Sequence, residues 1–384
     1  MDLRLTPVQT EFRDEIRTWL EENVPTEKFL PPSTEEGFAR HRAWERALHG
    51  AGFAAVHWPV DYGGRGMDPI STAIFYEEYL RAKAPARLNR LALGLAGPTL
   101  IEYGDGEQRS RWLESMLTCD HIWCQGFSEP EAGSDLAGLR TRGEVSGDTV
   151  LVNGQKIWTS HSRFADWIFA LVRTNPGAPK HNGLTFIMID RHSPGVEVRP
   201  IRQMNHEADF AELFFTDVEV PLANVIGGID NGWRVAMATL THERSSNLNT
   251  AAHFHQILGE VLALVPERLR SDPVIRAQIG RFHEEVEAYR YITLRTLSSL
   301  SVGKQPGPQS AMGKLWWSEM QTRILEFALS MLGERAELLE STHGKRSPLI
   351  QSYWLSRAAH IYAGSNEIQR NIISERVLGL PKGN

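Results

Sequence analysis

The chain has 384 residues, of which 41% are hydrophobic and 23% are charged, so it is long enough for two or three structural units with large cores. Its formal net charge is -6 and it has no block of lysine and arginine, which argues against nucleic acid or an anionic membrane surface as a partner. The two cysteines, Cys119 and Cys124, exclude a disulfide framework, and the N-terminus lacks the apolar stretch of a signal peptide. We therefore expect a cytoplasmic protein that acts on small molecules.

The first third of the chain has the periodicity of helices. Thr6 followed by Pro7 is typical of a helix start, and apolar residues from Val8 to Leu20 then recur at helical spacing. A glycine-rich loop is expected over 59–69. Further helices are predicted over 33–51, 75–80, 98–103 and 107–117.

The pattern changes near residue 120. Short segments rich in β-branched and aromatic residues predict strands over 122–127, 150–152, 167–172, 184–189 and 212–215. Several strands this close together suggest a small sandwich or barrel. From Gly232 to about residue 378 the pattern is helical again and predicts four or five helices of bundle length.

The expected fold is therefore α+β and multidomain. We predict an N-terminal α-helical domain over 1–120, a middle β-sandwich or barrel domain over 121–230, and a C-terminal four-helix bundle over 231–384.

Three segments carry residues suited to chemistry. The first, from Trp123 to Leu136, reads WCQGFSEPEAGSDL and is a strand that enters a loop of small and polar residues. The second, NGQKIWTS over 153–160, places an indole two residues before a hydroxyl, an arrangement that on a strand puts both side chains on one face. The third, IYAGSNEIQRNII over 361–373, opens a helix whose N-terminus favours an anionic group.

In this order and at these separations, the three segments resemble the acyl-CoA dehydrogenase family, including the bacterial enzymes of steroid degradation. The resemblance covers nearly the whole chain and implies FAD as the cofactor, lying between the β domain and the C-terminal bundle. It implies that Gln125, Phe127 and Ser128 contact the flavin pyrimidine, that Trp158 packs on the flavin, and that Ser160 lies near flavin N5. Ser365 and Glu367 correspond to contacts with the adenosine half of FAD, and Ser134, Arg244 and Gly364 to contacts with the acyl-CoA substrate.

The catalytic base departs from the commonest family pattern. Many members keep a glutamate after the tyrosine of the third segment, where this chain has Ala363, which cannot take a proton. A second pattern, as in isovaleryl-CoA dehydrogenase, places a glutamate before an arginine on the first long helix of the bundle. The residues in that place here are Glu243 and Arg244, so the resemblance assigns Glu243 as the base.

Assembly is a second departure. The family's Arg-x-x-Phe-Gly segment, which reaches the FAD of a neighbouring subunit, is absent between Pro266 and Arg281. Its later Gln-x-x-Gly-Gly contact is altered to Ser-Met-Leu-Gly-Glu over 330–334. The expected assembly is therefore either a homodimer or homotetramer that binds FAD differently, or a mixed assembly in which a related subunit supplies these groups.

Each residue also has a structural interpretation. Trp158 is compatible with a place in the core, Glu243 with an ion pair on a helix surface, and Ser365 with a helix cap. The set Cys119, His121 and Cys124 lacks zinc spacing, so no metal site is expected, and Gly63 to Gly66 is interpreted as a loop.

The predicted function is α,β-dehydrogenation of an acyl-CoA to a trans-2-enoyl-CoA, with electrons passing to an electron-transfer flavoprotein. A branched, cyclic or steroid-derived acyl group is preferred. The alternatives are an acyl-CoA oxidase or flavin monooxygenase of the same fold, and a non-catalytic subunit that has lost its base.

Overall fold

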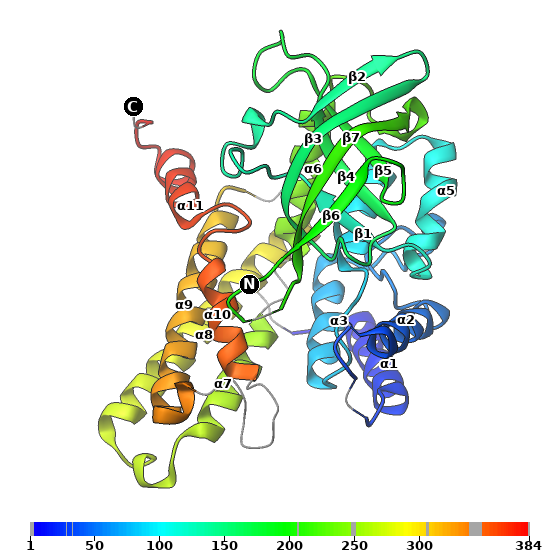
Figure 1. Ribbon diagram of the computed structural model, residues 1–384. Helices are drawn as coiled ribbons and strands as arrows, with labels where there is room; N and C mark the ends of the chain where they lie inside the picture. The colour runs from blue at the N-terminus through cyan, green and yellow to red at the C-terminus, as the bar shows by residue number, and fades with distance from the viewer. Residues whose placement is uncertain are drawn as a thin grey trace. The chain divides into compact units, whose positions relative to one another are not determined.

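The protein is described by a computed structural model that covers residues 4–27, 29–32, 34–205, 207–246, 251–304, 307–337 and 348–382. The chain forms two compact units, and each is built from more than one segment (Figure 1). The first, here called the bundle unit, comprises Met1–Glu21, Pro69–Ala82 and Asn247–Asn384. The second, the β unit, comprises Glu22–Asp68 and Lys83–Ser246.

The bundle unit is helical. Its helices are α1 (Pro7–Asn23), α3 (Pro69–Arg81), α7 (Ala251–Leu264), α8 (Pro273–Ser301), α9 (Ser310–Leu332), α10 (Pro348–Ala358) and α11 (Asn366–Ile372), with short turns η6 (Glu267–Leu269), η7 (Gly333–Glu337) and η8 (Ile373–Val377). The predicted helix start at Thr6 is present, since Gln9 N–H donates to the Thr6 hydroxyl at 3.2 Å. Asp272, which was not predicted as a cap, accepts from the first turn of α8. Buried side chains at helical spacing, such as Phe282, Val286 and Tyr289 on α8, form its core.

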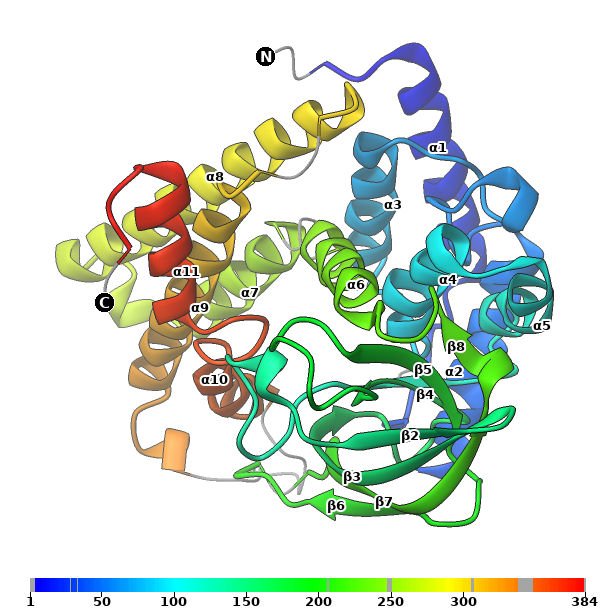
Figure 2. The same cartoon turned by 90° about the horizontal axis from the view of Figure 1, so that it is seen from above.

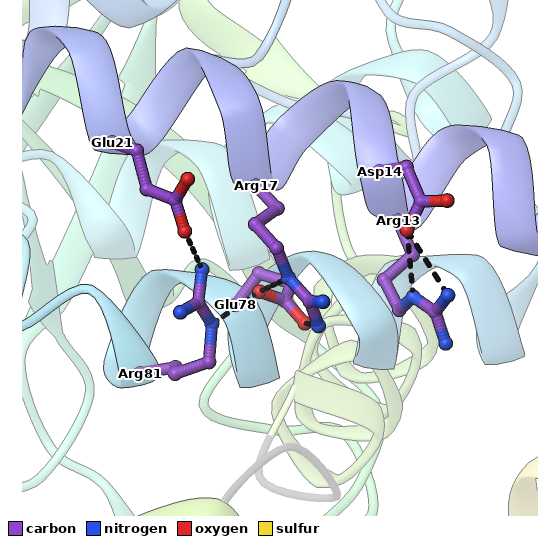
Figure 3. A network of polar contacts seen from close by, with 6 residues as sticks. All are labelled: Arg13, Asp14, Arg17, Glu21, Glu78 and Arg81. Atoms are coloured by element: carbon purple, nitrogen blue, oxygen red, sulfur yellow. Dashed lines mark hydrogen bonds and ion pairs between the residues drawn. The ribbon is translucent and has the colours of Figure 1, made fainter.

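Helices α1 and α3 are joined by a charge network (Figure 3). Arg17 donates two hydrogen bonds to Glu78, at 2.6 and 3.0 Å, and Arg81 donates a third at 2.6 Å. Arg81 also binds Glu21 at 2.9 Å. The Glu78 side chain is buried, and burial raises its pKa, but the hydrogen bonds and charges of the two arginines outweigh this and hold the pKa below its usual range.

The β unit contains both helices and the sheet. Its helices are α2 (Glu35–Gly50), α4 (Gly97–Tyr103), α5 (Gly106–Leu117) and α6 (Gly232–Ser246), with short turns η1 (Val60–Tyr62), η2 (Ala92–Ala96), η3 (Leu136–Gly138) and η4 (Leu222–Asn224). Its strands are β1 (Trp123–Gly126), β2 (Arg142–Ser146), β3 (Thr149–Ser160), β4 (Trp167–Arg173), β5 (Leu184–Asp190), β6 (Val196–Ile201), β7 (Phe210–Pro221) and β8 (Val225–Ile226).

The strands of the described residues are hydrogen-bonded in the order β6-β7-β3-β2-β4-β5-β8, and β1 pairs in parallel with β4. Only the Arg142–Arg173 pair joins β2 to β4, so the order divides there into two layers. Ile168, Ala170 and Val172 of β4 face the core between the layers, whereas Phe169 and Leu171 belong to a core shared with the helices. Burial on both faces explains the unbroken apolar run of β4. One face of this strand is turned to the layer that contains β2, β3, β6 and β7, and the other is turned to α4 and α6 (Figure 2).

Along the chain, helices are followed by the strands β1 to β8 and then by helices again, as predicted, and the α+β architecture is confirmed. The second helix begins at Glu35 rather than 33, because Thr34 caps it by accepting from Gly37 N–H. The sequence pattern did not predict β2, β6 and β8, and α4 is preceded by the π-helical turn η2. The domain boundaries at 120 and 230 stay a prediction.

We expect Glu78→Gln to lower the free energy of unfolding by about 1–3 kcal/mol, because it leaves Arg17 and part of Arg81 without a charged acceptor. Because folding lowers the pKa of Glu78, this contribution is complete above the unfolded-state value of about 4.3 and is lost as the pH falls through the folded-state value. Urea denaturation at pH 7 measures the loss in the free energy of unfolding, and denaturation at pH 3 measures how much of the contribution has disappeared. The control Glu21→Gln removes an exposed pair and should cost less than about 1 kcal/mol. Equal losses for the two variants would contradict the assignment.

Candidate functional site in two parts

The loop after β1 is held by a buried ion pair. Lys156 on β3 is fully buried, and its Nζ donates to Glu129 Oε1 at 2.8 Å and to the carbonyl of Phe127 at 3.2 Å. Glu129 also accepts from the backbone N–H groups of Arg140 at 2.6 Å and Thr141 at 2.9 Å. One carboxylate thus ties together the start of the loop, its end and strand β3.

Burial and the pairing itself shift the pKa values of both Lys156 and Glu129. Burial lowers the pKa of Lys156 to about 8, although Glu129 partly opposes this. Burial raises the pKa of Glu129, but the charge and hydrogen bonds of Lys156 and the backbone donors outweigh it and leave the pKa below its usual range. At neutral pH the pair is therefore ionised, and neither partner is left alone in the core.

The first two sequence segments come together in the β unit. Ile157 N–H donates to the carbonyl of Ser128 at 2.9 Å, next to the Glu129–Lys156 pair. Phe127 is buried against Phe169 and Phe186, with ring centroids 5.9 and 5.8 Å away. Gln125 and Ser128 are half-buried, whereas Ser134 is exposed.

Strand β3 is irregular at Trp158. Its φ is +60°, and the ladder with β7 shifts register between Lys156 and Thr159. The predicted sharing of one face by Trp158 and Ser160 assumed regular alternation, which this bulge interrupts. The indole is 58% exposed and touches Phe210 edge-on, so a plain core role for Trp158 is wrong.

The donors here suit a planar ring with polar edges. The Trp158 indole offers a large exposed apolar face, and Ser128 and Ser160 are half-buried residues within three positions of the Ile157–Ser128 hydrogen bond. The hydroxyl of Thr159 is buried and has no hydrogen-bond partner within the described residues. A buried hydroxyl without a partner is costly unless a ligand or water satisfies it. These residues therefore fit an isoalloxazine ring.

The third segment lies in the bundle unit and forms a tight turn. Ala363 and Gly364 both have left-handed backbone conformations, with φ of +53° and +80°. Gln369 Nε2 donates to their carbonyls at 3.2 and 3.1 Å. Ser365 caps α11 by accepting from Ile368 N–H at 3.4 Å, so its predicted capping role is confirmed. Glu367 is exposed, and hydrogen bonds from its own N–H and from Ser365 lower its pKa.

Glu243 and Arg244 lie in the last turns of α6, but their side chains are outside the described residues. The helix before them is fixed within the β unit. Thr239 is buried and bonds to Thr99 on α4 at 2.8 Å, and His242 lies 3.4 Å from Glu102. The assignment of Glu243 as base stays a prediction.

The two cysteines considered as metal ligands lie in the protein core. Cys119 and Cys124 are buried, and burial raises the pKa of both thiols, that of Cys119 to about 12. Among the residues with described coordinates, no cluster of His, Cys, Asp and Glu could hold a metal ion. Over the same residues, no helix is both long and apolar enough to cross a membrane.

The sequence interpretation missed Glu129 and Lys156. Lys156 lies beyond the strand predicted over 150–152, whereas β3 continues to Ser160 and places this lysine in the core, where it requires a partner. The glutamate of the SEPEAGSD loop was the nearest acidic candidate.

Comparison with known families gives three adjoining matches. The N-terminal domain of acyl-CoA dehydrogenase matches residues 6–120, the middle domain 124–218 and the C-terminal domain 230–378. Acyl-CoA dehydrogenase IpdE1 of Mycolicibacterium smegmatis is 40% identical to this chain over 97% of this chain and 98% of its own length.

Two solved structures cover the whole chain and are covered completely by it. The Tcur3481-Tcur3483 steroid ACAD aligns with a TM-score of 0.88 and 26% identity. The ChsE4-ChsE5 complex from Mycobacterium tuberculosis aligns with a TM-score of 0.87 and 30% identity.

We expect Glu129→Gln to destabilise the protein by about 3–5 kcal/mol, because it leaves the Lys156 ammonium buried without a counter-charge. The double variant Glu129→Gln/Lys156→Met should lose less than the sum of the single variants. The control Asp135→Asn breaks the exposed pair with Lys180 in the same loop and should cost about 0–1 kcal/mol. Urea unfolding followed by tryptophan fluorescence measures the unaltered protein and the four variants, which include Lys156→Met alone. Additive losses would show that the pair is not coupled.

Proposed function

This chain belongs to the acyl-CoA dehydrogenase family, and we propose that it is an FAD-dependent enzyme that converts an acyl-CoA thioester to the trans-2-enoyl-CoA. The observation that carries the proposal is the Ser128–Ile157 contact beside the exposed indole of Trp158, which joins two of the family's segments in one place.

Gln125, Phe127, Ser128, Trp158 and Ser160 would hold the flavin ring. Ser365 and Glu367 would contact the adenosine half. When bound, FAD accepts the hydride that leaves the substrate's β-carbon. The rigid β1 loop supports this role, because donors fixed by a buried ion pair do not need to be ordered on binding.

Glu243 would take the α-proton. The α-proton of a thioester is weakly acidic, so a carboxylate must be held against the carbon while the bond breaks. Two features support this assignment: Ala363 has no ionisable group, and the turn of α6 before Glu243 is anchored by the Thr239–Thr99 hydrogen bond. Arg244, Ser134 and Gly364 would contact the CoA thioester.

The substrate class we propose is a ring-bearing or branched acyl-CoA, most specifically a steroid-derived one. One of the similar structures is a steroid ACAD that aligns over the whole chain. The small side chain of Ala363 also leaves more room than a glutamate would at that place.

The test is anaerobic flavin bleaching. The purified yellow protein should lose its absorbance near 450 nm on addition of steroid-derived or branched CoA esters. Glu243→Gln should retain FAD and lose turnover by about a hundred- to ten-thousand-fold, because it keeps the shape of the side chain but cannot take a proton.

The matched control is Glu260→Gln, which changes an exposed glutamate on α7 and should leave turnover unchanged. Full turnover in Glu243→Gln would remove the proposed base. Bleaching only by straight-chain esters would remove the proposed substrate class, and oxygen consumption without an added acceptor would favour an oxidase over transfer to an electron-transfer flavoprotein.

We further propose a mixed assembly with a related subunit. The altered segment over 330–334 and the missing Arg-x-x-Phe-Gly support it, since both would otherwise reach a neighbour's FAD. A similar solved structure is itself a complex of two chains, ChsE4 and ChsE5.

Native mass spectrometry of the complex from its own cells should give a mass that is not a multiple of 43.3 kDa. It should also contain fewer FAD molecules than chains, because one chain type lacks the groups that complete the neighbour's site. A homo-oligomer with one FAD in every chain would contradict the mixed assembly.

A further inference from the structure

A second buried lysine, Lys314 on α9, has no part in the mechanism described above. Its residue is only 8% exposed, and its Nζ donates to Asn366 Oδ1 at 2.8 Å. Burial lowers its pKa to about 8, although Glu367 and Glu319 oppose this. An apolar residue would pack in this place at less cost, so the ammonium needs another reason to be there.

The ammonium is the first member of an ordered chain of hydrogen bonds. Asn366 Oδ1 also accepts from Ser318 Oγ at 3.0 Å, and Asn366 Nδ2 donates to His360 Nδ1 at 2.9 Å. Because an amide nitrogen can only donate, His360 Nδ1 must accept, and its protonated Nε2 then donates to Thr322 Oγ1 at 2.9 Å. The Asn366 amide and the His360 imidazole therefore each have one permitted orientation, whereas the Ser318 hydroxyl can donate to Asn366 Oδ1 or to the carbonyl of Leu315 at 3.2 Å.

This chain of hydrogen bonds fixes the turn over 363–367. Asn366 is the first residue of α11. Its N–H donates to the carbonyl of His360 at 2.9 Å, and this hydrogen bond joins the two ends of the turn. The turn contains the left-handed residue Ala363, whose conformation costs roughly 1 kcal/mol and persists only where its surroundings hold it. Helices α9 and α11 lie side by side in both views (Figure 1, Figure 2).

We propose that Lys314 is a positioning residue for the cofactor, which acts through Asn366 to present Ser365 and Glu367 to the adenosine half of FAD. The inference rests on the proposed function. It adds that the affinity for the adenosine half depends on a side chain that does not touch the cofactor. Ser365 and Glu367 flank Asn366 directly, so any displacement of the amide moves both.

The experiment compares two flavins, because FMN has the ring of FAD but lacks its adenosine half. The complete assembly that contains this chain is freed of flavin and titrated with FAD and with FMN, and the ratio of the two Kd values is measured. In Lys314→Met we expect FAD to bind about tenfold more weakly while the FMN Kd is unchanged, because a hydrogen bond from a charged donor is lost on the adenosine side alone. The control Lys304→Met removes an exposed charge of the same unit and should leave both Kd values unchanged.

A purely structural role would weaken both flavins equally or neither, and either result would overturn the inference. If Lys314→Met does not fold, Ser318→Ala removes the other donor to Asn366 Oδ1, and the FAD Kd alone should rise about threefold to fivefold. An unchanged ratio in Ser318→Ala would equally overturn it. If the complete assembly with the unaltered chain binds neither flavin, the proposed function itself is wrong.

Discussion

The buried contact between Glu129 and Lys156 sets the geometry of the β unit's site. An ammonium inside a β-sandwich must be paired, and Glu129 provides the counter-charge while it accepts from two backbone N–H groups further along its loop. The loop after β1 is therefore fixed at both ends against β3. The bulge that exposes Trp158 follows directly after Lys156, so the paired lysine is the last residue before the ladder with β7 shifts register. The loop that carries Ser128 is held against β3 through the same pair.

Much of the fold could be predicted because local signals agreed with burial. Thr6 and Pro7 start α1, and the apolar runs of β4 and β5 are buried on both faces. Strand β2 escaped prediction because most of its residues are exposed and polar, and β6 because it has no buried residue and contains Pro200, which ordinarily argues against a strand. A π-helical turn such as η2 has no residue pattern of its own. An apolar helix face predicts burial but not the partner. Hence the packing of α3 with α7 and α8, more than 150 residues away in sequence, could not be read from the chain.

The site was predictable by residue type and less so by conformation. The sequence pointed to the segments that contain Ser128, Trp158 and Ser365, and the first two segments do meet. It could not indicate that Trp158 and Ala363 adopt left-handed conformations, because only glycine signals these reliably. Nor could it rank Lys156 and Lys314 above the chain's other lysines, since burial depends on tertiary packing. Glu243 remains a prediction for a different reason: its side chain lies outside the described residues.

The discontinuous make-up of the bundle unit has a consequence for synthesis on the ribosome. The β unit is complete once residue 246 has emerged, whereas α3 must wait for α7 and α8, which follow residue 250. At about 5–20 residues per second, the remaining stretch takes on the order of ten seconds to be made. During that interval α3 has none of its later partners to pack against. This helix therefore reaches its final packing only late in synthesis.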